Sequence, residues 1–293
     1  MKSQAEAEEL LQGEPEAGEP KLALDTESPP EAQRMGLASR ILARLERMLP
    51  HGQGVPLLDR KTIIVLLSVS VLLTFFWYYG RLPFFHKFWV PRFFADEPRE
   101  MVELYAHFYL SISSIIFRML LPLLLILFVL RERPRDYGYR VRGTLGLFKI
   151  YLFLLAVMLP LLFIASGMES FQAKYPLNKT AANSLGLFLT YELSYIFVFV
   201  SGEAFWRGYI VNGLAPKFGL YALPVMAIPY AMVHFGKPFP ESLGAILAGI
   251  VLGYIALKHR SFWFGIALHA TIAVSMDLLV LWRKGQLWPL LVG

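Results

Sequence analysis

Long apolar stretches, separated by short polar segments, fill this chain from about residue 62 to its end. A helix needs about 20 mainly apolar residues to cross the hydrocarbon core of a membrane. Seven stretches are close to that length: Thr62–Tyr79, Phe108–Leu130, Phe148–Gly167, Ser184–Phe205, Leu220–Phe235, Leu243–Lys258 and Phe262–Trp282. The pattern predicts an all-α fold, a polytopic membrane bundle of seven transmembrane helices, or eight if Leu82–Val90 also enters the membrane.

The part of the chain before the first apolar stretch follows a different pattern. Residues 1–35 are rich in Glu, Pro, Ala and Gly, and they offer too little apolar surface to offset chain entropy, so we expect a disordered acidic tail. Residues 36–60 carry an apolar stripe at helical spacing, made by Leu37, Ile41, Leu45 and Met48. This stripe predicts an amphipathic helix on the membrane surface and a linker. A helix packed on the protein's own loops fits the same pattern. Residues 61–293 then form the membrane domain.

The composition agrees with a membrane protein. Hydrophobic residues make up 56 % of the chain and charged residues only 17 %, whereas soluble domains carry about 25 % charged residues. The chain contains no cysteine, which excludes disulfides, thiolate metal sites and cysteine nucleophiles.

The basic residues gather on alternate loops. They precede the first apolar stretch, follow the second and the fourth, and separate the sixth from the seventh. This alternation obeys the positive-inside rule if the N-terminus is cytoplasmic. We therefore interpret the net charge of +6 as membrane topology, expect the lipid bilayer as a partner, and expect no nucleic acid. The acidic tail and the compact body suggest a bacterial inner membrane, with the endoplasmic reticulum as the alternative.

Four ionisable residues lie inside the apolar stretches of the second half of the chain: Glu203, Arg207, His234 and His269. An ionised side chain at membrane depth costs roughly 2.5–3.5 kcal/mol on insertion scales. Glu203 and Arg207 are four residues apart and therefore share a helix face, whereas the histidines belong to two other stretches. Such residues usually mark functional sites, although an ion pair and hydrogen bonds that only join helices would use the same residue types.

The segments around these residues resemble three motifs of a known family. Residues 203–209 read Glu-Ala-Phe-Trp-Arg-Gly-Tyr, residues 230–235 read Tyr-Ala-Met-Val-His-Phe, and residues 269–273 read His-Ala-Thr-Ile-Ala. They are similar to the CAAX-protease and bacteriocin-processing family, also called Abi or type II CAAX prenyl endopeptidase-like. Its pattern is roughly Glu-Glu-x-x-x-Arg, then Phe-x-x-x-His, then His-x-x-x-Asn. The resemblance covers about residues 184–282, and the loop Arg135–Arg140 also has the look of the family.

The resemblance implies an intramembrane endopeptidase that acts on a membrane-associated peptide or protein. By analogy with the family, Glu203 would be the general base and His234 its partner in activating a water. His269 would stabilise the oxyanion, and Arg207 would hold Glu203 in place. We expect these four residues to converge in one polar cavity, where Glu203 and His234 share a water.

Two motif positions depart from the family pattern. Gly202 stands where the first glutamate is expected, and Ala273 stands where the asparagine is expected. Three other acids are possible compensating residues: Glu192, Glu241 and Asp277. Hydrogen bonding between helices, or helix capping by Glu241, would equally explain them. A catalytically inactive family member with a role in membrane-protein binding or immunity therefore stays an alternative, and a transporter or proton channel is a third.

A metal cofactor is a further open point. His234, His269 and Glu203 offer three ligands of the kinds that zinc accepts, with one position left open. The helical zinc spacing His-Glu-x-x-His is absent from the sequence. We therefore expect no tightly bound metal, with zinc as the alternative, and the sequence does not identify the substrate.

Overall fold

The computed structural model describes residues 59–141 and 144–292. The expected acidic tail of residues 1–35 lies outside these residues, as does the expected surface helix of residues 36–60 apart from its last two positions. The first described helix, α2 (Arg60–Tyr79), begins where Asp59 caps it, because the Asp59 carboxylate accepts a hydrogen bond from the Thr62 backbone N–H at 2.9 Å.

The described part of the chain is built from helices and contains no strand. Six helical stretches within it are long and apolar enough to cross a membrane: Arg60–Tyr79, Arg99–Leu130, Phe148–Ser166, Leu185–Met232, Phe239–His259 and Trp263–Arg283. The prediction of an all-α, polytopic membrane bundle is therefore confirmed. The segment Leu82–Val90, considered as an eighth span, forms short helical pieces, α3 (Leu82–Phe84) and η2 (Phe85–Trp89), that pack against α5 (Arg99–Ile115).

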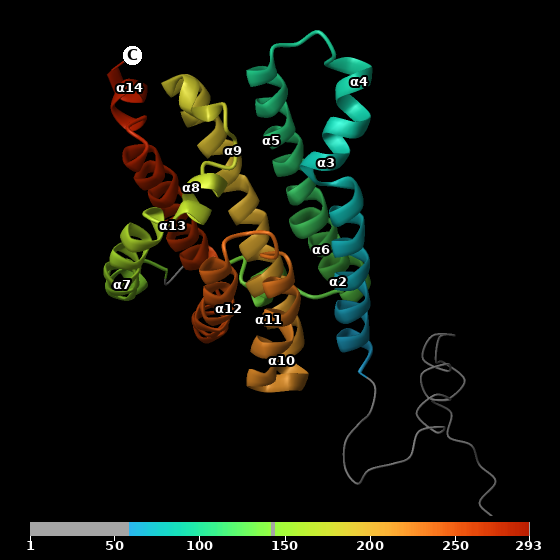
Figure 1. Cartoon of the computed structure of the whole chain (residues 1–293). Helices are drawn as coiled ribbons and strands as arrows, with labels where there is room; N and C mark the ends of the chain where they lie inside the picture. The colour runs from blue at the N-terminus through green and yellow to red at the C-terminus, as the bar shows by residue number, and fades with distance from the viewer. Residues whose placement is uncertain (1–58, 142–143, 293) are drawn as a thin grey trace, which may run out of the picture. The chain divides into compact units, whose positions relative to one another are not determined.

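The stretch Leu185–Met232 combines two of the predicted spans, because its helices follow one another without a loop. It consists of α9 (Leu185–Glu203), η8 (Ala204–Asn212), α10 (Gly213–Phe218), η9 (Gly219–Tyr221) and α11 (Ala222–Met232). The chain turns back at Gly219, whose φ of 53° and ψ of −131° suit only glycine. α11 consequently packs against η8 (Figure 1). With 11 residues, α11 is shorter than a usual membrane span.

The two ends of the bundle carry different segments. The start of α2 and α10 lie at the lower end in Figure 1, whereas the loop between α4 (Val90–Phe93) and α5, the start of α9, and α14 (Leu287–Val292) lie at the upper end. The first described helix therefore begins at the opposite end of the bundle from α14.

α9 occupies the centre of the bundle. It packs against α5 on one side and against α13 (Trp263–Arg283) on another, and η8 continues into contact with α12 (Phe239–His259). Serine side chains join α9 to α5: Ser111 Oγ donates to the carbonyl oxygen of Ser194 at 2.6 Å, and the hydroxyls of Ser114 and Ser201 contact each other. Such small residues allow close packing of helices in a membrane.

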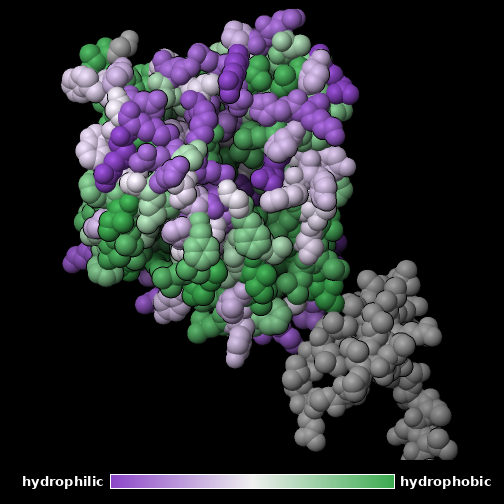
Figure 2. All heavy atoms as spheres, viewed as in Figure 1, coloured by the Kyte–Doolittle hydropathy of each residue, from purple (hydrophilic) through white to green (hydrophobic). Residues whose placement is uncertain are grey.

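Apolar side chains cover much of the outside of the bundle. α7 (Phe148–Ser166) exposes many large ones, among them Phe153 and Ile164, as expected for a helix that faces lipid. Figure 2 shows hydrophobic residues over the lower half of one face and hydrophilic residues over the upper half, where the surface is hollowed.

The loop that contains Glu132 and η5 (Pro134–Tyr137) is anchored against η8. Lys61 Nζ lies 2.7 Å from Glu132 Oε2, and the hydroxyl of buried Tyr137 donates to the same oxygen at 2.6 Å. A Cβ on Gly208 would lie only 2.8 Å from the carbonyl oxygen of Tyr137, so glycine at 208 permits this approach. The loop thereby supports the turn of η8 that directly follows Arg207.

Candidate active site

Glu203 lies at the point where α9 widens into the π-helix η8. All nine residues of η8 are buried. A π-helical turn adds one residue per hydrogen-bonded ring and changes the direction of the following side chains, which is why such turns often occur at functional sites. Here η8 packs against α11, which carries Tyr230, and against α12.

The carboxylate of Glu203 contacts two of the predicted site residues. Its Oε1 atom lies 3.0 Å from Arg207 Nη1 and 3.1 Å from His269 Nδ1, and the side chain is only 1 % exposed. Helix α13 can come this close because residue 265 is glycine: a Cβ there would lie 2.4 Å from Glu203 Oε2. α9 and α13 therefore meet directly at the carboxylate.

Arg207 balances the buried charge of Glu203. Its guanidinium is completely buried and lies 4.4 Å from the centre of the Tyr230 ring, a cation–π contact with α11. Asn212 Nδ2 donates to the carbonyl oxygen of Arg207 at 2.8 Å and fixes the backbone there. Both contacts fix the position of Arg207 beside Glu203, and a buried ion pair is costly unless its geometry is good.

We call Glu203, Arg207, His234 and His269 the cluster. His269 is more accessible than Glu203 and Arg207. Its side chain is 24 % exposed, and its ring packs 4.4 Å from the ring of Phe199 on α9. Nδ1 faces Glu203, so the other ring nitrogen, Nε2, is the atom left for a water or a substrate. The hydrogen bond to a carboxylate favours the tautomer with the proton on Nδ1.

His234 joins the cluster through Tyr230. α11 ends at Met232, so His234 lies in the turn after the helix and not within the predicted span. Its Nδ1 atom lies 2.7 Å from the carbonyl oxygen of Tyr230, and its ring packs 4.6 Å from the Tyr230 ring. The four predicted residues therefore form a chain of contacts in the order His269, Glu203, Arg207 and, across the Tyr230 ring, His234.

Two further residues lie near Glu203 and Arg207, and the motif analysis gave neither a role in the site. They are Tyr230 and Arg118. Tyr230 occupies a motif position, but its contact with Arg207 depends on how α11 packs on η8. Arg118 is buried beside α9 and lies within electrostatic range of Glu203. Arg118 could have been found from the sequence, because it is a basic residue inside the apolar stretch Phe108–Leu130.

The three acids considered as compensating residues have other partners. Glu241 accepts hydrogen bonds from Tyr175 Oη at 2.6 Å and from Lys237 Nζ at 2.7 Å. Burial by itself would lower the pKa of Lys237, but Tyr195, Tyr175 and Glu241 raise the pKa well above its usual value. Lys237 is therefore charged, and it is engaged with Glu241.

Glu192 and Asp277 face each other across the α9–α13 interface. Both are buried, and Tyr191 Oη donates to Asp277 Oδ2 at 3.2 Å. Eleven residues of α9, roughly 16 Å of helix, separate Glu192 from Glu203.

The zinc ligand set is only partly assembled. Glu203 and His269 are in contact, whereas His234 is turned toward Tyr230 by its Nδ1 hydrogen bond. Across residues 59–141 and 144–292, no three His, Asp or Glu side chains come close enough together to hold a metal ion.

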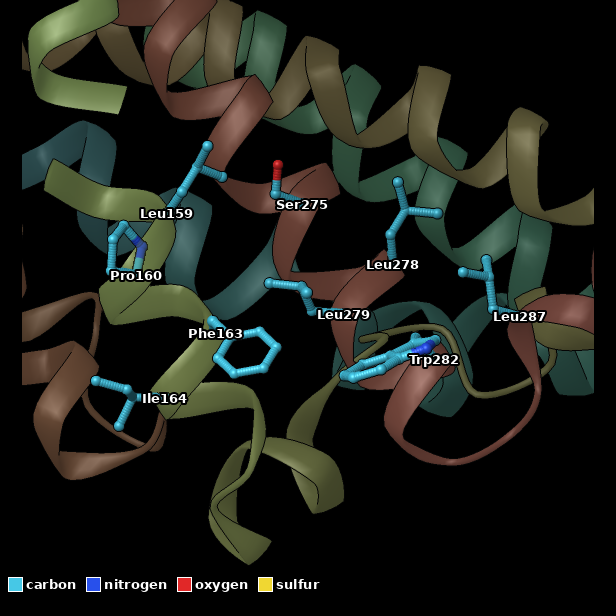
Figure 3. Close-up of a pocket in the computed structure, with 9 residues that line it drawn as sticks. All are labelled: Leu159, Pro160, Phe163, Ile164, Ser275, Leu278, Leu279, Trp282 and Leu287. Atoms are coloured by element: carbon cyan, nitrogen blue, oxygen red, sulfur yellow. The ribbon is translucent and has the colours of Figure 1, made fainter. Parts of the chain in front are cut away.

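A separate groove lies between α7, α13 and α14 (Figure 3). It has a volume of about 710 Å³ and a mainly apolar lining that includes Leu159, Phe163, Leu279 and Trp282, with Ser275 as the one hydroxyl side chain drawn there. It shares α13 with His269 but contains none of the predicted site residues, so it is separate from them.

The comparisons with known proteins agree with the motif resemblance. The family model for type II CAAX prenyl endopeptidase Rce1-like proteins matches residues 184–275. The match covers less than half of the chain, but it includes all four residues of the cluster. The resemblance to the CAAX-protease family is therefore confirmed, and the protein is a CAAX protease-like, multi-pass membrane protein. Searches of curated proteins and of solved structures found no match.

Proposed function

We propose that the protein is an intramembrane endopeptidase, a hydrolase that cleaves a peptide bond of a membrane-associated peptide or protein. The observation that carries the proposal is the contact between Glu203 and His269 in the membrane bundle, at 3.1 Å between Oε1 and Nδ1. A buried carboxylate that orients an accessible imidazole is an established arrangement for activating a nucleophile.

The geometry favours His269 as the group that receives the proton of the water. Glu203 accepts the hydrogen bond from His269 Nδ1–H, which leaves Nε2 free to act as a base. The water oxygen then bonds to the carbonyl carbon, and the carbonyl oxygen takes up the negative charge. When the intermediate collapses, the C–N bond breaks and the proton on His269 passes to the leaving amine.

This assignment differs from the role expected by analogy, in which Glu203 is the base and His234 its partner. Glu203 is 1 % exposed and its Oε1 is held by both Arg207 and His269, whereas His269 is 24 % exposed. Orienting His269 therefore suits Glu203 better than direct contact with a water. His234, whose Nε2 faces away from its Tyr230 hydrogen bond, is available to bind the substrate or the oxyanion.

The experiment compares membrane-attached peptides from cells that lack the protein with those from cells that express the wild type or Glu203→Gln. We expect at least one terminal peptide to be shortened only with the wild type, because the glutamine keeps the shape of the side chain and loses its charge. If no peptide differs in length between the wild type and the deletion, the endopeptidase proposal fails.

The second candidate is a catalytically inactive family member that binds membrane proteins. The observation in its favour is the absence of side-chain functional groups at Gly202 and Ala273. Cross-linking in membranes distinguishes the two candidates. An inactive binder captures the same partner with the wild type and with Glu203→Gln, and the partner keeps its full length in both.

A further inference from the structure

The groove between α7 and α13 has no role in the reaction proposed above, and we call it the α7–α13 groove. Its volume of about 710 Å³ is within the range of roughly 300–1,000 Å³ that is usual for pockets that bind small molecules. The part of α13 that lines it runs from Ser275 to Trp282, which is roughly 10 Å of helix. Because the lining is mainly apolar, a molecule that fills the groove has to be apolar over this length.

One end of the α7–α13 groove lies where two membrane-spanning helices end. The apolar stretch of α7 ends at Ser166 and that of α13 ends at Arg283. Phe163 and Trp282 line the groove close to these ends, and their ring centres lie 6.0 Å apart (Figure 3). Trp282 is 51 % exposed and Trp288 of α14 is 73 % exposed. Because exposed tryptophans are typical of the level of the lipid headgroups, this end of the groove opens at the membrane surface.

Arg283 lies at the opening of the groove. Its guanidinium carbon is 4.5 Å from the centre of the Phe163 ring and 5.1 Å from the centre of the Trp282 ring, the two aromatic rings of the lining. Its Nη2 atom donates to the carbonyl oxygen of Phe163 at 3.1 Å. A guanidinium carries several further N–H donors, and the Arg283 side chain is exposed. The opening therefore presents a fixed positive charge with donors that can bind a ligand.

Lys284 adds a second positive charge next to Arg283. It is exposed, and its Nζ atom donates to the carbonyl oxygen of Tyr175 at 3.3 Å. Within residues 59–141 and 144–292, neither Arg283 nor Lys284 forms an ion pair with a carboxylate. Two positive charges without a carboxylate partner thus stand at the surface end of an apolar groove. This combination is complementary to a molecule with a hydrocarbon chain and an anionic head.

We propose that the α7–α13 groove binds an anionic phospholipid, with an acyl chain along the groove and the phosphate group at Arg283 and Lys284. Hydrogen bonds between charged groups are stronger than those between neutral groups, so the phosphate oxygens are held at the opening. A zwitterionic phospholipid offers the same chain, but it carries its own cation beside the phosphate and gains less from the two basic residues. The site does not depend on the proposed hydrolysis, because His269 lies outside the groove.

The test uses the full chain in lipid vesicles and measures the fluorescence of Trp282. All vesicles contain the same mixture of phosphatidylcholine and phosphatidylglycerol, and a fixed small share of lipid carries bromine atoms midway along an acyl chain. The bromine label is either on phosphatidylglycerol or on phosphatidylcholine. Bromine quenches tryptophan fluorescence on contact, and the difference between the wild type and Trp282→Phe isolates the signal of Trp282. We expect labelled phosphatidylglycerol to quench Trp282 more strongly, with a preference of about 5-fold for each basic residue that contacts the lipid.

Three variants separate the headgroup contact from the groove. Arg283→Gln should lower the preference for phosphatidylglycerol about 5-fold, whereas Arg283→Lys keeps the charge and should keep most of the preference. Ser275→Phe places a ring in the groove and should reduce the quenching of Trp282 by both labelled lipids. Equal quenching by the two labelled lipids in the wild type would mean that the groove accepts any acyl chain, and would overturn the proposal. A preference that stays unchanged in Arg283→Gln would also overturn it.

Trp77 and Arg81 provide the matched control. The guanidinium carbon of Arg81 lies 3.8 Å from the centre of the Trp77 ring, and Trp77 is 45 % exposed, but neither residue lines the α7–α13 groove. With Trp77→Phe as the blank, Trp77 should show little preference between the two labelled lipids. An equal preference at Trp77 and Trp282 would indicate general attraction of anionic lipid to a basic protein, and would overturn the proposal. Quenching of Trp282 that is weaker than that of Trp77 with both labels would mean that protein covers the groove, which would overturn it too.

Discussion

At the scale of single residues, Gly265 decides how closely α13 approaches the site. Gly265→Ala places a methyl carbon 2.4 Å from Glu203 Oε2, so the carboxylate or the helix must move. We expect a loss of about 1–3 kcal/mol in the free energy of unfolding, the usual effect of overpacking, and reduced cleavage because the hydrogen bond to His269 is disturbed. Thermal unfolding in detergent measures the first effect.

Gly244→Ala is the control for this prediction. Gly244 lies in α12, and no atom lies within 4 Å of the Cβ it would carry. Alanine is the better helix former by about 1 kcal/mol, so this variant should be neutral or slightly stabilised. Equal melting temperatures for the two alanine variants would contradict the packing of Glu203 against α13.

The sequence was sufficient to single out Glu203, Arg207, His234 and His269 as site candidates, because ionisable residues stand out inside apolar stretches, and their role in a reaction stays a prediction. It was not sufficient to predict their pairing. Motif order suggests His234 as the partner of Glu203, whereas the hydrogen bond in the structure comes from His269. Which histidine reaches the carboxylate depends on the crossing of α9 and α13 at Gly265, and that is a property of the packed helices.

At the scale of elements, the apolar stretches predict where the long helices lie, but not their internal geometry. The π-helix η8 begins directly after Glu203 and buries all nine of its residues. In a π-helix each backbone hydrogen bond spans one residue more than in an α-helix. Whether such bonds form depends on the neighbours that pack around the helix. The end of α11 differs from the prediction in a similar way. The sequence predicts a span that ends at Phe235, whereas α11 ends at Met232 and His234 lies in the following turn.

The loop that supports η8 gives a prediction about pH. Partial burial opposes ionisation of Glu132, but its hydrogen bonds from Lys61 and Tyr137 are stronger and hold the pKa of this carboxyl below its usual value. A lowered pKa means that the stabilisation is present above the usual glutamate pKa and is lost as the pH falls through the lowered value. Glu132→Gln should therefore be less stable than the wild type at neutral pH.

The measurement for this prediction is the melting temperature of both proteins from neutral to acidic pH. The difference between them should shrink as the pH falls, because the wild-type carboxyl then becomes protonated and resembles the glutamine. A difference that stays constant with pH would mean that the charge of Glu132 does not hold the loop against η8.

At the scale of the whole molecule, the basic loops predict which end of the bundle faces the cytoplasm. The chain has no native cysteine, so single cysteines can be introduced without other changes. Arg133→Cys should react with a membrane-impermeant thiol reagent only from the cytoplasmic side, and Glu97→Cys, at the opposite end of the bundle, only from the outside. Labelling with the opposite sidedness would reverse the orientation.

The fold as a whole was more predictable than its count of spans. Long apolar stretches and few charges are sufficient for an all-α membrane bundle, because only helices satisfy their own backbone hydrogen bonds in each segment. The count depends on local turns such as Gly219, where two predicted spans follow each other without a loop. The expected tail and surface helix before residue 59 lie outside the described residues and stay predictions.

The most direct test of the Glu203–His269 pair is a double-mutant comparison of cleavage by the purified protein in lipid vesicles. Glu203→Gln, His269→Gln and the double variant are compared with His86→Gln. His86 is a partly exposed histidine that contacts Glu103, far from Glu203 in the chain. If the pair acts as a unit, each single variant should lose about 10²–10⁴-fold in kcat, and the double variant should lose no more than the single variants do. Wild-type cleavage by either single variant, or losses that multiply in the double variant, would contradict the proposed site.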